Sequence, residues 1–252
     1  MPFLIILYII VLRKFLKVLA VLFILIVSSG VVCAQDNASD VLADDYNQIL
    51  ADSNNDVLGE PLKTFTDLKN DISGAVDVFE VTSDYKFDNA TDNKNGILIN
   101  TTSLVINGNG HTIDASNQAR IFLINASQLV INDLTFINAN ITEGSALLMV
   151  NSNVTTNNVV FKNSVANNGV ISASGTKYLS NNDVFKDVTS TKNGVIKLYR
   201  SAGTFDNATF NSSKDLVWGF IYDNGNSALI VRNFVFANTT SNILMLLNDQ
   251  VK

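Results

Sequence analysis

Short apolar runs and polar turns alternate along most of this chain, and the alternation recurs at a fixed interval. Four glycines stand 25 residues apart, each directly before a strand-like apolar run: Gly144, Gly169, Gly194 and Gly219. Counting by about the same interval in both directions places further runs at 97–99, 120–124 and 243–246. The pattern predicts about seven units of about 25 residues each within residues 96–252.

A second column of residues has the same spacing. Phenylalanines recur every 24 to 26 residues, each at the end of a similar five-residue segment: Phe136, Phe161, Phe185, Phe210 and Phe236. The residue three positions before each one is Asp or Asn: Asp133, Asn158, Asn182, Asn207 and Asn233. These two residue types tolerate left-handed backbone and cap turns. We expect the Phe side chains to form an interior ladder, with Asn stacked on Asn at a turn.

A unit of this length cannot bury its apolar face alone and has no room for a helix, so the units must stack on one another. Stacked strands then lie roughly 4.8 Å apart. An antiparallel sandwich is the alternative, but hairpins rarely hold a period so closely. We therefore predict an all-β fold, a single-stranded parallel β-helix solenoid of about seven coils, with a glycine at one corner of each coil.

Residues 62–95 predict an N-terminal cap. Thr64 is a helix-capping residue type and Gly74 a helix stop, and the residues between them have the pattern of a short amphipathic helix. Residues 75–87 then predict a strand. Such a cap would cover the unpaired amides and apolar surface of the first coil. The apolar positions of the predicted helix are Phe65, Leu68 and Ile72.

The opposite end has no comparable pattern in residues 242–252. We expect the last coil to stay open, to stack on a partner, or to continue into a longer array.

Residues 1–34 have the pattern of a secretory signal. Arg13, Lys14 and Lys17 form a basic cluster, an apolar run follows, and the break comes after Ala34. The apolar run is shorter than the roughly 20 residues that span a bilayer. We expect cleavage after Ala34, with the N-terminal segment contacting a membrane during export. Retention as an uncleaved anchor is the alternative, because apolar residues also precede the basic cluster.

Residues 35–61 carry seven acidic residues and no basic one, which predicts a flexible acidic spacer. Without the signal, the chain holds 14 basic and 23 acidic residues, a net charge of −9. We expect no nucleic-acid partner, because phosphate contacts need Lys and Arg. The 34 Asn residues suit many tight polar turns. Cys33, the single cysteine, would leave with the signal.

Three segments resemble a known family. They are Ile106-Asn-Gly-Asn-Gly-His-Thr-Ile-Asp114, Gln118-Ala-Arg-Ile-Phe122 and Leu129-Val-Ile-Asn-Asp-Leu-Thr-Phe-Ile-Asn138. They closely resemble the adhesin-like surface proteins of methanogenic archaea and, more loosely, are similar to the polymorphic outer-membrane proteins of some bacteria. The resemblance covers about residues 65–252. It implies a right-handed parallel β-helix of the pectin-lyase-like type.

Few catalytic residue types come together in the sequence. His111 is the only histidine and the mature chain has no cysteine, so an ordinary zinc site is excluded. Asp183 and Asp206 stand near corresponding turns and are the one candidate carboxylate pair for glycoside hydrolysis, although Asp in place of a turn Asn explains them more simply. The resemblance to the pectin-lyase-like fold also implies that a lyase would use a Lys or Arg as its general base. Arg120 and Arg200 are the candidates for that role. We expect no enzymatic activity, no metal and no cofactor.

Aromatic residues late in the repeat are candidates for a binding strip. Trp218, Phe220 and Tyr222 alternate, near Tyr199, and alternation puts them on one face of a strand. An outward face would bind a sugar or a protein, and interior packing is the alternative.

Nine Asn-x-Ser/Thr acceptor sites are a modest excess over chance and fit a secreted glycoprotein. The candidates within the repeat are Asn125, Asn140, Asn153, Asn207, Asn211 and Asn238.

Together these features predict an extracellular or cell-surface adhesin-like protein whose rigid flank binds a cell-surface glycan, a wall polymer or a protein of a partner cell. A polysaccharide lyase or hydrolase on the same fold is one alternative. A structural surface-layer component that stacks through its C-terminal coil is the other.

Overall fold

The computed structural model describes residues 62–215, 217, 219–225, 227–241 and 245–248, with side chains described up to residue 241. The predicted signal (1–34) and acidic spacer (35–61) lie outside these residues, as does Trp218.

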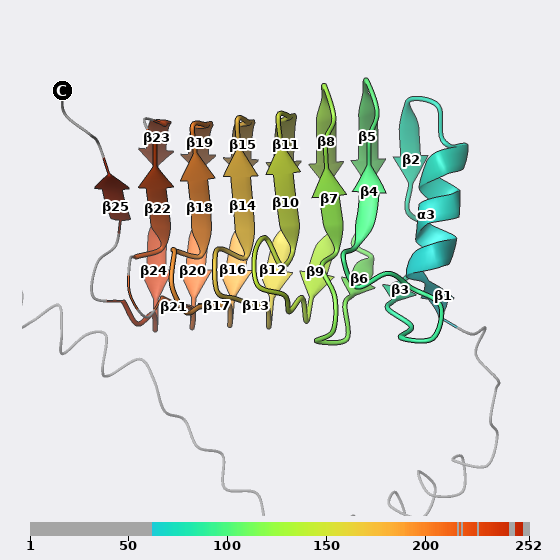
Figure 1. The fold of residues 1–252 in the computed structure, drawn as a ribbon, viewed down its shortest axis with the longest axis horizontal. Coiled ribbons are helices and arrows are strands. Elements are labelled where there is room, and N and C mark those ends of the chain that lie inside the picture. The colour runs from blue at the N-terminus through green and yellow to red at the C-terminus, as the bar shows by residue number, and fades with distance from the viewer. Residues whose placement is uncertain (1–61, 216, 218, 226, 242–244, 249–252) are drawn as a thin grey trace, which may run out of the picture. The chain divides into compact units, whose positions relative to one another are not determined.

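The chain winds through stacked coils, and each strand pairs in parallel with the corresponding strands of neighbouring coils (Figure 1). We number the sheets in the order in which a coil passes through them. Sheet 1 has seven strands: β4 (Ile97–Ile99), β7 (Phe122–Ile124), β10 (Leu147–Val150), β14 (Ile171–Ser174), β18 (Ile196–Tyr199), β22 (Ile221–Asn224) and β25 (Met245–Asn248).

Sheet 2 also has seven strands: β2 (Val78–Glu80), β5 (Leu104–Asn107), β8 (Leu129–Asn132), β11 (Asn153–Asn157), β15 (Lys177–Asn181), β19 (Ala202–Asp206) and β23 (Ala228–Arg232). Sheet 3 has eight: β1 (Lys63–Thr64), β3 (Tyr85–Lys86), β6 (Thr112–Asp114), β9 (Thr135–Ile137), β12 (Val160–Lys162), β16 (Val184–Lys186), β20 (Thr209–Asn211) and β24 (Val235–Ala237). A small sheet 4 joins β13 (Val165–Ala166), β17 (Thr189–Ser190) and β21 (Lys214–Asp215).

The register of the sheets confirms the predicted coil. In sheet 1, Leu147 pairs with Phe122 of the coil before and with Ile171 of the coil after. Seven strands in each of sheets 1 and 2 correspond to the predicted seven coils. The fold is therefore an all-β parallel solenoid.

The interior holds the predicted phenylalanine ladder. Phe136, Phe161, Phe185 and Phe210 are fully buried, and successive ring centroids lie 4.7 to 5.6 Å apart. Phe236 is partly buried and stacks on Phe210 at 5.3 Å. The residues on either side of each Phe in its strand point outward, so one side chain per strand of sheet 3 enters the core.

The turn between sheets 2 and 3 holds two columns of asparagine. In the outer column each residue has a left-handed φ of 50° to 56°: Asp133, Asn158, Asn182, Asn207 and Asn233. Side-chain amides within this column donate to the coil before over 2.9 to 3.2 Å. In the neighbouring column Asn132, Asn157 and Asn181 bond in the same way, beginning at Asn107. These bonds confirm the predicted stacking of Asn on Asn.

The helix α3 (Phe65–Gly74) begins as predicted, at the capping residue Thr64. The Thr64 side chain accepts a hydrogen bond from the Asp67 N–H, and the Asp67 carboxylate accepts one from the Thr64 N–H. Along the chain, the helix follows β1 of sheet 3 and precedes β2 of sheet 2. It therefore takes the place that a sheet 1 strand has in later coils (Figure 1). Its buried residues are those that the sequence predicts, Phe65, Leu68 and Ile72.

The single strand predicted for residues 75–87 is wrong in detail, because the segment forms two short strands, β2 and β3, in different sheets. The break between them includes Asp84. Its carboxylate accepts a hydrogen bond from the Thr112 N–H and contacts His111 Nδ1 in the next coil.

Candidate functional site

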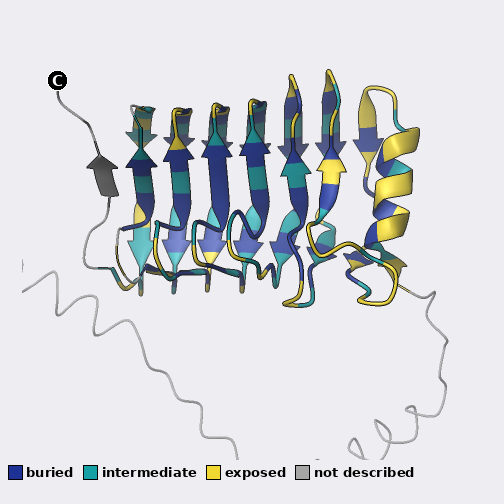
Figure 2. Cartoon of the chain, viewed as in Figure 1, coloured by how far each residue is buried: buried dark blue, intermediate teal, exposed yellow. Residues whose placement is uncertain are grey.

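The outer face of sheet 1 carries one column of side chains that changes character along the stack. In-register pairing places these residues next to one another: Leu98, Leu123, Leu148, Ser172, Lys197 and Tyr222. The column is aliphatic beside the N-terminal cap and then turns polar and aromatic. Figure 2 shows its exposed end at β4, where 53% of the Leu98 surface is accessible.

The structure separates the three predicted aromatic residues that it describes. Phe220 is fully buried, with its ring 5.0 Å from Phe210 and 5.2 Å from Phe236, so it is a core residue and cannot contact an external ligand. The predicted alternation fails because Phe220 lies in the corner before β22, at a position that is also buried in the two preceding coils, as Val170 and Val195. Tyr222 lies half-buried on the outer face of sheet 1, while Tyr199 is 37% exposed.

Tyr199 is the last residue of β18 and lies against Arg200. The guanidinium carbon of Arg200 is 5.1 Å from the centre of the Tyr199 ring, a cation–π distance. Tyr199 is two residues along the strand from Lys197, whose register partner is Tyr222. Two residues along a strand and one strand across separate the two tyrosine Cα atoms by roughly 8 Å. We call Lys197, Tyr199, Arg200 and Tyr222 the sheet 1 patch.

Lys197 is fixed within this patch by Glu143, which lies two coils away. Its Nζ donates to Glu143 Oε1 over 2.6 Å, and the same oxygen accepts a hydrogen bond from Ser172 Oγ over 3.1 Å. No sequence pattern indicates this ion pair, since 54 residues separate its members.

The structure does not form the predicted pair of Asp183 and Asp206. Asp206 stands in the asparagine column of sheet 2, in register with Asn181, and confirms Asp as a turn residue. Asp183 corresponds instead to Ala208 and is fully buried in the interior. A carboxylate inside the solenoid and one at an outer turn cannot act on the same glycosidic bond.

Asp183 belongs to a buried polar cluster that sequence reasoning missed. Its carboxylate accepts hydrogen bonds from the hydroxyls of Thr156 and Ser180 and from the Val159 N–H. The Tyr178 hydroxyl bonds Thr156 over 2.9 Å. Burial without a cation raises the pKa of Asp183 to about 6, while the three hydrogen bonds oppose that rise. Asp183 stands two residues before Phe185, as the buried Val159 stands two residues before Phe161. That spacing could have indicated that Asp183 is buried.

Two further residues considered in the sequence, Arg120 and His111, have structural contacts. Arg120 is 8% exposed, and its guanidinium donates to the carbonyls of Asn95, Glu143 and Gly144. Burial lowers the pKa of Arg120 from its ordinary value. His111 lies in a turn, where its Nδ1 is 3.0 Å from Asp84. Arg120 therefore binds main-chain carbonyls, and His111 pairs with one carboxylate at the surface.

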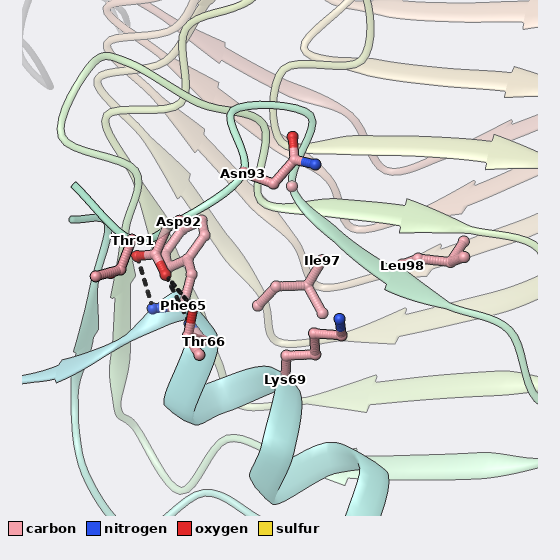
Figure 3. A pocket seen from close by; sticks show the side chains of 9 residues that line it. Phe65, Thr66, Lys69, Thr91, Asp92, Asn93, Ile97 and Leu98 are labelled. Atoms are coloured by element: carbon pink, nitrogen blue, oxygen red, sulfur yellow. Dashed lines mark hydrogen bonds between the residues drawn. The ribbon is translucent and has the colours of Figure 1, made fainter. Parts of the chain in front are cut away.

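A small pocket of about 250 Å³ opens between α3 and β4 (Figure 3). Phe65, Ile97 and Leu98 form its apolar wall, and Lys69 lies at its side. The Asp92 carboxylate in the pocket accepts hydrogen bonds from the backbone N–H groups of Phe65 and Thr66. The N-terminus of α3 is therefore already occupied by a carboxylate and is not an open anion site.

The glycosylation candidates differ in accessibility. Asn125, Asn140 and Asn238 are exposed outside strands or at their ends. Asn207 is exposed, but its amide donates to Asn182 within the turn ladder. The remaining two candidates are half-buried in strands, Asn153 in β11 and Asn211 in β20.

Comparison with known protein families, curated proteins and solved structures finds no match to this chain. Within the described residues, no three His, Cys, Asp or Glu side chains gather as a metal site would require. None of the helices in that part of the chain has the length and apolar character to span a membrane.

Proposed function

We propose that this chain is a secreted or cell-surface adhesin-like protein, similar to those of methanogenic archaea, whose sheet 1 patch binds a glycan on a wall polymer or partner cell. The observation that carries the proposal is the outward placement of Tyr199 and Tyr222 on adjacent strands of a rigid sheet. Tyrosine rings offer flat apolar surface with a polar edge, which suits sugar rings.

The rigidity of the face supports this proposal. The strands under the patch pair on both sides, and its lysine is held by the ion pair with Glu143. A prearranged surface loses less conformational entropy on binding than a mobile loop. The candidate catalytic residues support binding over turnover, because Arg120 holds carbonyls and Asp183 is buried.

A glycan array and a binding assay with intact source cells test the proposal. The double variant Tyr199→Ala/Tyr222→Ala should lose most binding, while Thr155→Ala on the outer side of sheet 2 should keep it. Equal binding by both variants would move the site away from sheet 1. Release of reducing ends from a bound polysaccharide would favour the enzyme. Self-assembly without any glycan or cell binding would favour the surface-layer component.

A further inference from the structure

Arg200 has an unusual backbone conformation for its residue type. Its φ is 48°, in the left-handed region. Every other non-glycine residue with positive φ in the described chain is Asn, Asp or Ser. A long side chain gains nothing in that region that would offset the steric conflict of its Cβ. Such conformations persist where the surrounding structure imposes them, and they concentrate at functional sites.

The corner that holds Arg200 alternates large and small residues along the stack. Asn151, Gly175, Arg200 and Gly225 follow the last residues of successive strands of sheet 1, and all four have positive φ. A Cβ on Gly225 would stand 3.1 Å from the Tyr199 ring and 3.4 Å from Arg200 Cγ. The Tyr199 ring and the Arg200 stem therefore lie over Gly225, where no side chain competes for the space.

The guanidinium of Arg200 is accessible to a ligand. The residue is exposed, and no carboxylate in the described part of the chain forms an ion pair with it. Lys197, by contrast, is bound to Glu143. In a chain of net charge −6, a stacked and unpaired guanidinium at the edge of an aromatic patch selects for negative charge in a ligand.

We propose that Arg200 and Tyr199 select an anionic polysaccharide, which deepens the proposed glycan-binding function and rests on it. The guanidinium pairs with the oxyanion of an acidic sugar while the Tyr199 ring packs on the sugar face. A patch of four residues on two adjacent strands suits an extended polymer, whereas a folded acidic protein would require a larger complementary surface.

Matched dextrans test this selectivity. Carboxymethyl dextran should bind the full chain at least tenfold more tightly than neutral dextran, and Arg200→Gly should remove that difference. A tenfold loss is about the effect of one charge-assisted hydrogen bond. Arg200→Gly should leave Tm unchanged or higher, because glycine adopts this φ without strain. Arg200→Lys keeps the charge but not the planar fork, so it should recover binding only in part.

Lys177→Gln is the matched control, since it removes one exposed positive charge from sheet 2 in the coil before and should leave selectivity intact. Equal losses in Lys177→Gln and Arg200→Gly would overturn the proposal in favour of general charge attraction, as would equal binding of dextran sulfate to all variants. Tight binding of neutral dextran with no preference for its carboxymethyl form would overturn the selectivity and leave the proposed function standing. Absence of binding to every glycan, charged or neutral, would overturn both.

Discussion

The backbone N–H of Val159 donates to the Asp183 carboxylate over 2.9 Å. The two residues hold corresponding positions in adjacent coils. This column is otherwise apolar, with Leu134 before the pair and Ala208 after it. Asp183 therefore places a carboxyl group where its neighbours place hydrocarbon. The one other titratable group in the cluster is the Tyr178 hydroxyl, whose pKa burial raises well above its ordinary value.

Asp183 should make the protein more stable in acid than it otherwise would be. The pKa of Asp183 is about 6 in the folded protein, against the ordinary value of 3.8 in an unfolded chain. The folded protein therefore binds the proton more tightly than the unfolded chain does. The resulting stabilisation is complete below about pH 4 and is lost as the pH rises through 6. Two pKa units correspond to roughly 3 kcal/mol. Urea unfolding of Asp183→Asn should therefore show a gain over wild type that is larger at pH 8 than at pH 4 by about that amount.

Asp187→Asn serves as the control, because Asp187 is exposed in the same coil and Asn accepts its φ of 54°. The pH-dependent gain in Asp183→Asn should exceed any change seen in Asp187→Asn. An Asp183→Asn curve parallel to wild type from pH 4 to pH 8 would show that the buried carboxyl does not titrate in this range.

The sequence could predict the coil because its columns repeat, but not the exceptions within them. Gly144, Phe161 and Asn158 each recur with their neighbours, so spacing alone assigns a corner, a core position and a turn. The prediction for Phe220 is wrong because it extends strand alternation into a corner, where the residue before the strand is buried in successive coils, as Val170 and Val195 are. The bond between Lys197 and Glu143 depends on how far two side chains reach across coils. The spacing of residues along the sequence does not indicate the distance between these two side chains.

The phenylalanine ladder should dominate stability. Phe161 stacks between Phe136 and Phe185, with ring centroids 5.6 and 4.9 Å away. Phe161→Ala leaves a cavity that backbone paired on both sides cannot close, so we expect a loss of about 3 to 5 kcal/mol in the free energy of unfolding. Lys162→Ala, on the next and outward position, should change it by less than about 0.5 kcal/mol. Chemical denaturation of the two variants makes the comparison, and similar losses in both would contradict an inward ladder.

The left-handed asparagine column predicts different effects for alanine and glycine. Asn182 has a φ of 56°, donates to Asn158 and accepts from Asn207. Asn182→Ala and Asn182→Gly both lose these two bonds, but only alanine must also enter the left-handed region. We expect Asn182→Ala to be less stable than Asn182→Gly by about 1 kcal/mol in urea unfolding. An alanine variant as stable as the glycine one would show that backbone conformation is not the reason for Asn in this column.

Arg120 and Arg200 should separate a residue that holds the fold from one that faces a ligand. Arg120→Ala leaves the carbonyls of Asn95, Glu143 and Gly144 without their donor in a buried corner, and we expect a loss of about 3 kcal/mol or more. Arg120→Lys should recover only part, because an ammonium cannot reproduce the planar spread of the guanidinium donors. Arg200→Gly should unfold at the same urea concentration as wild type or a higher one. Normal stability in Arg120→Ala together with loss of a polysaccharide-cleaving activity would instead make Arg120 a catalytic residue.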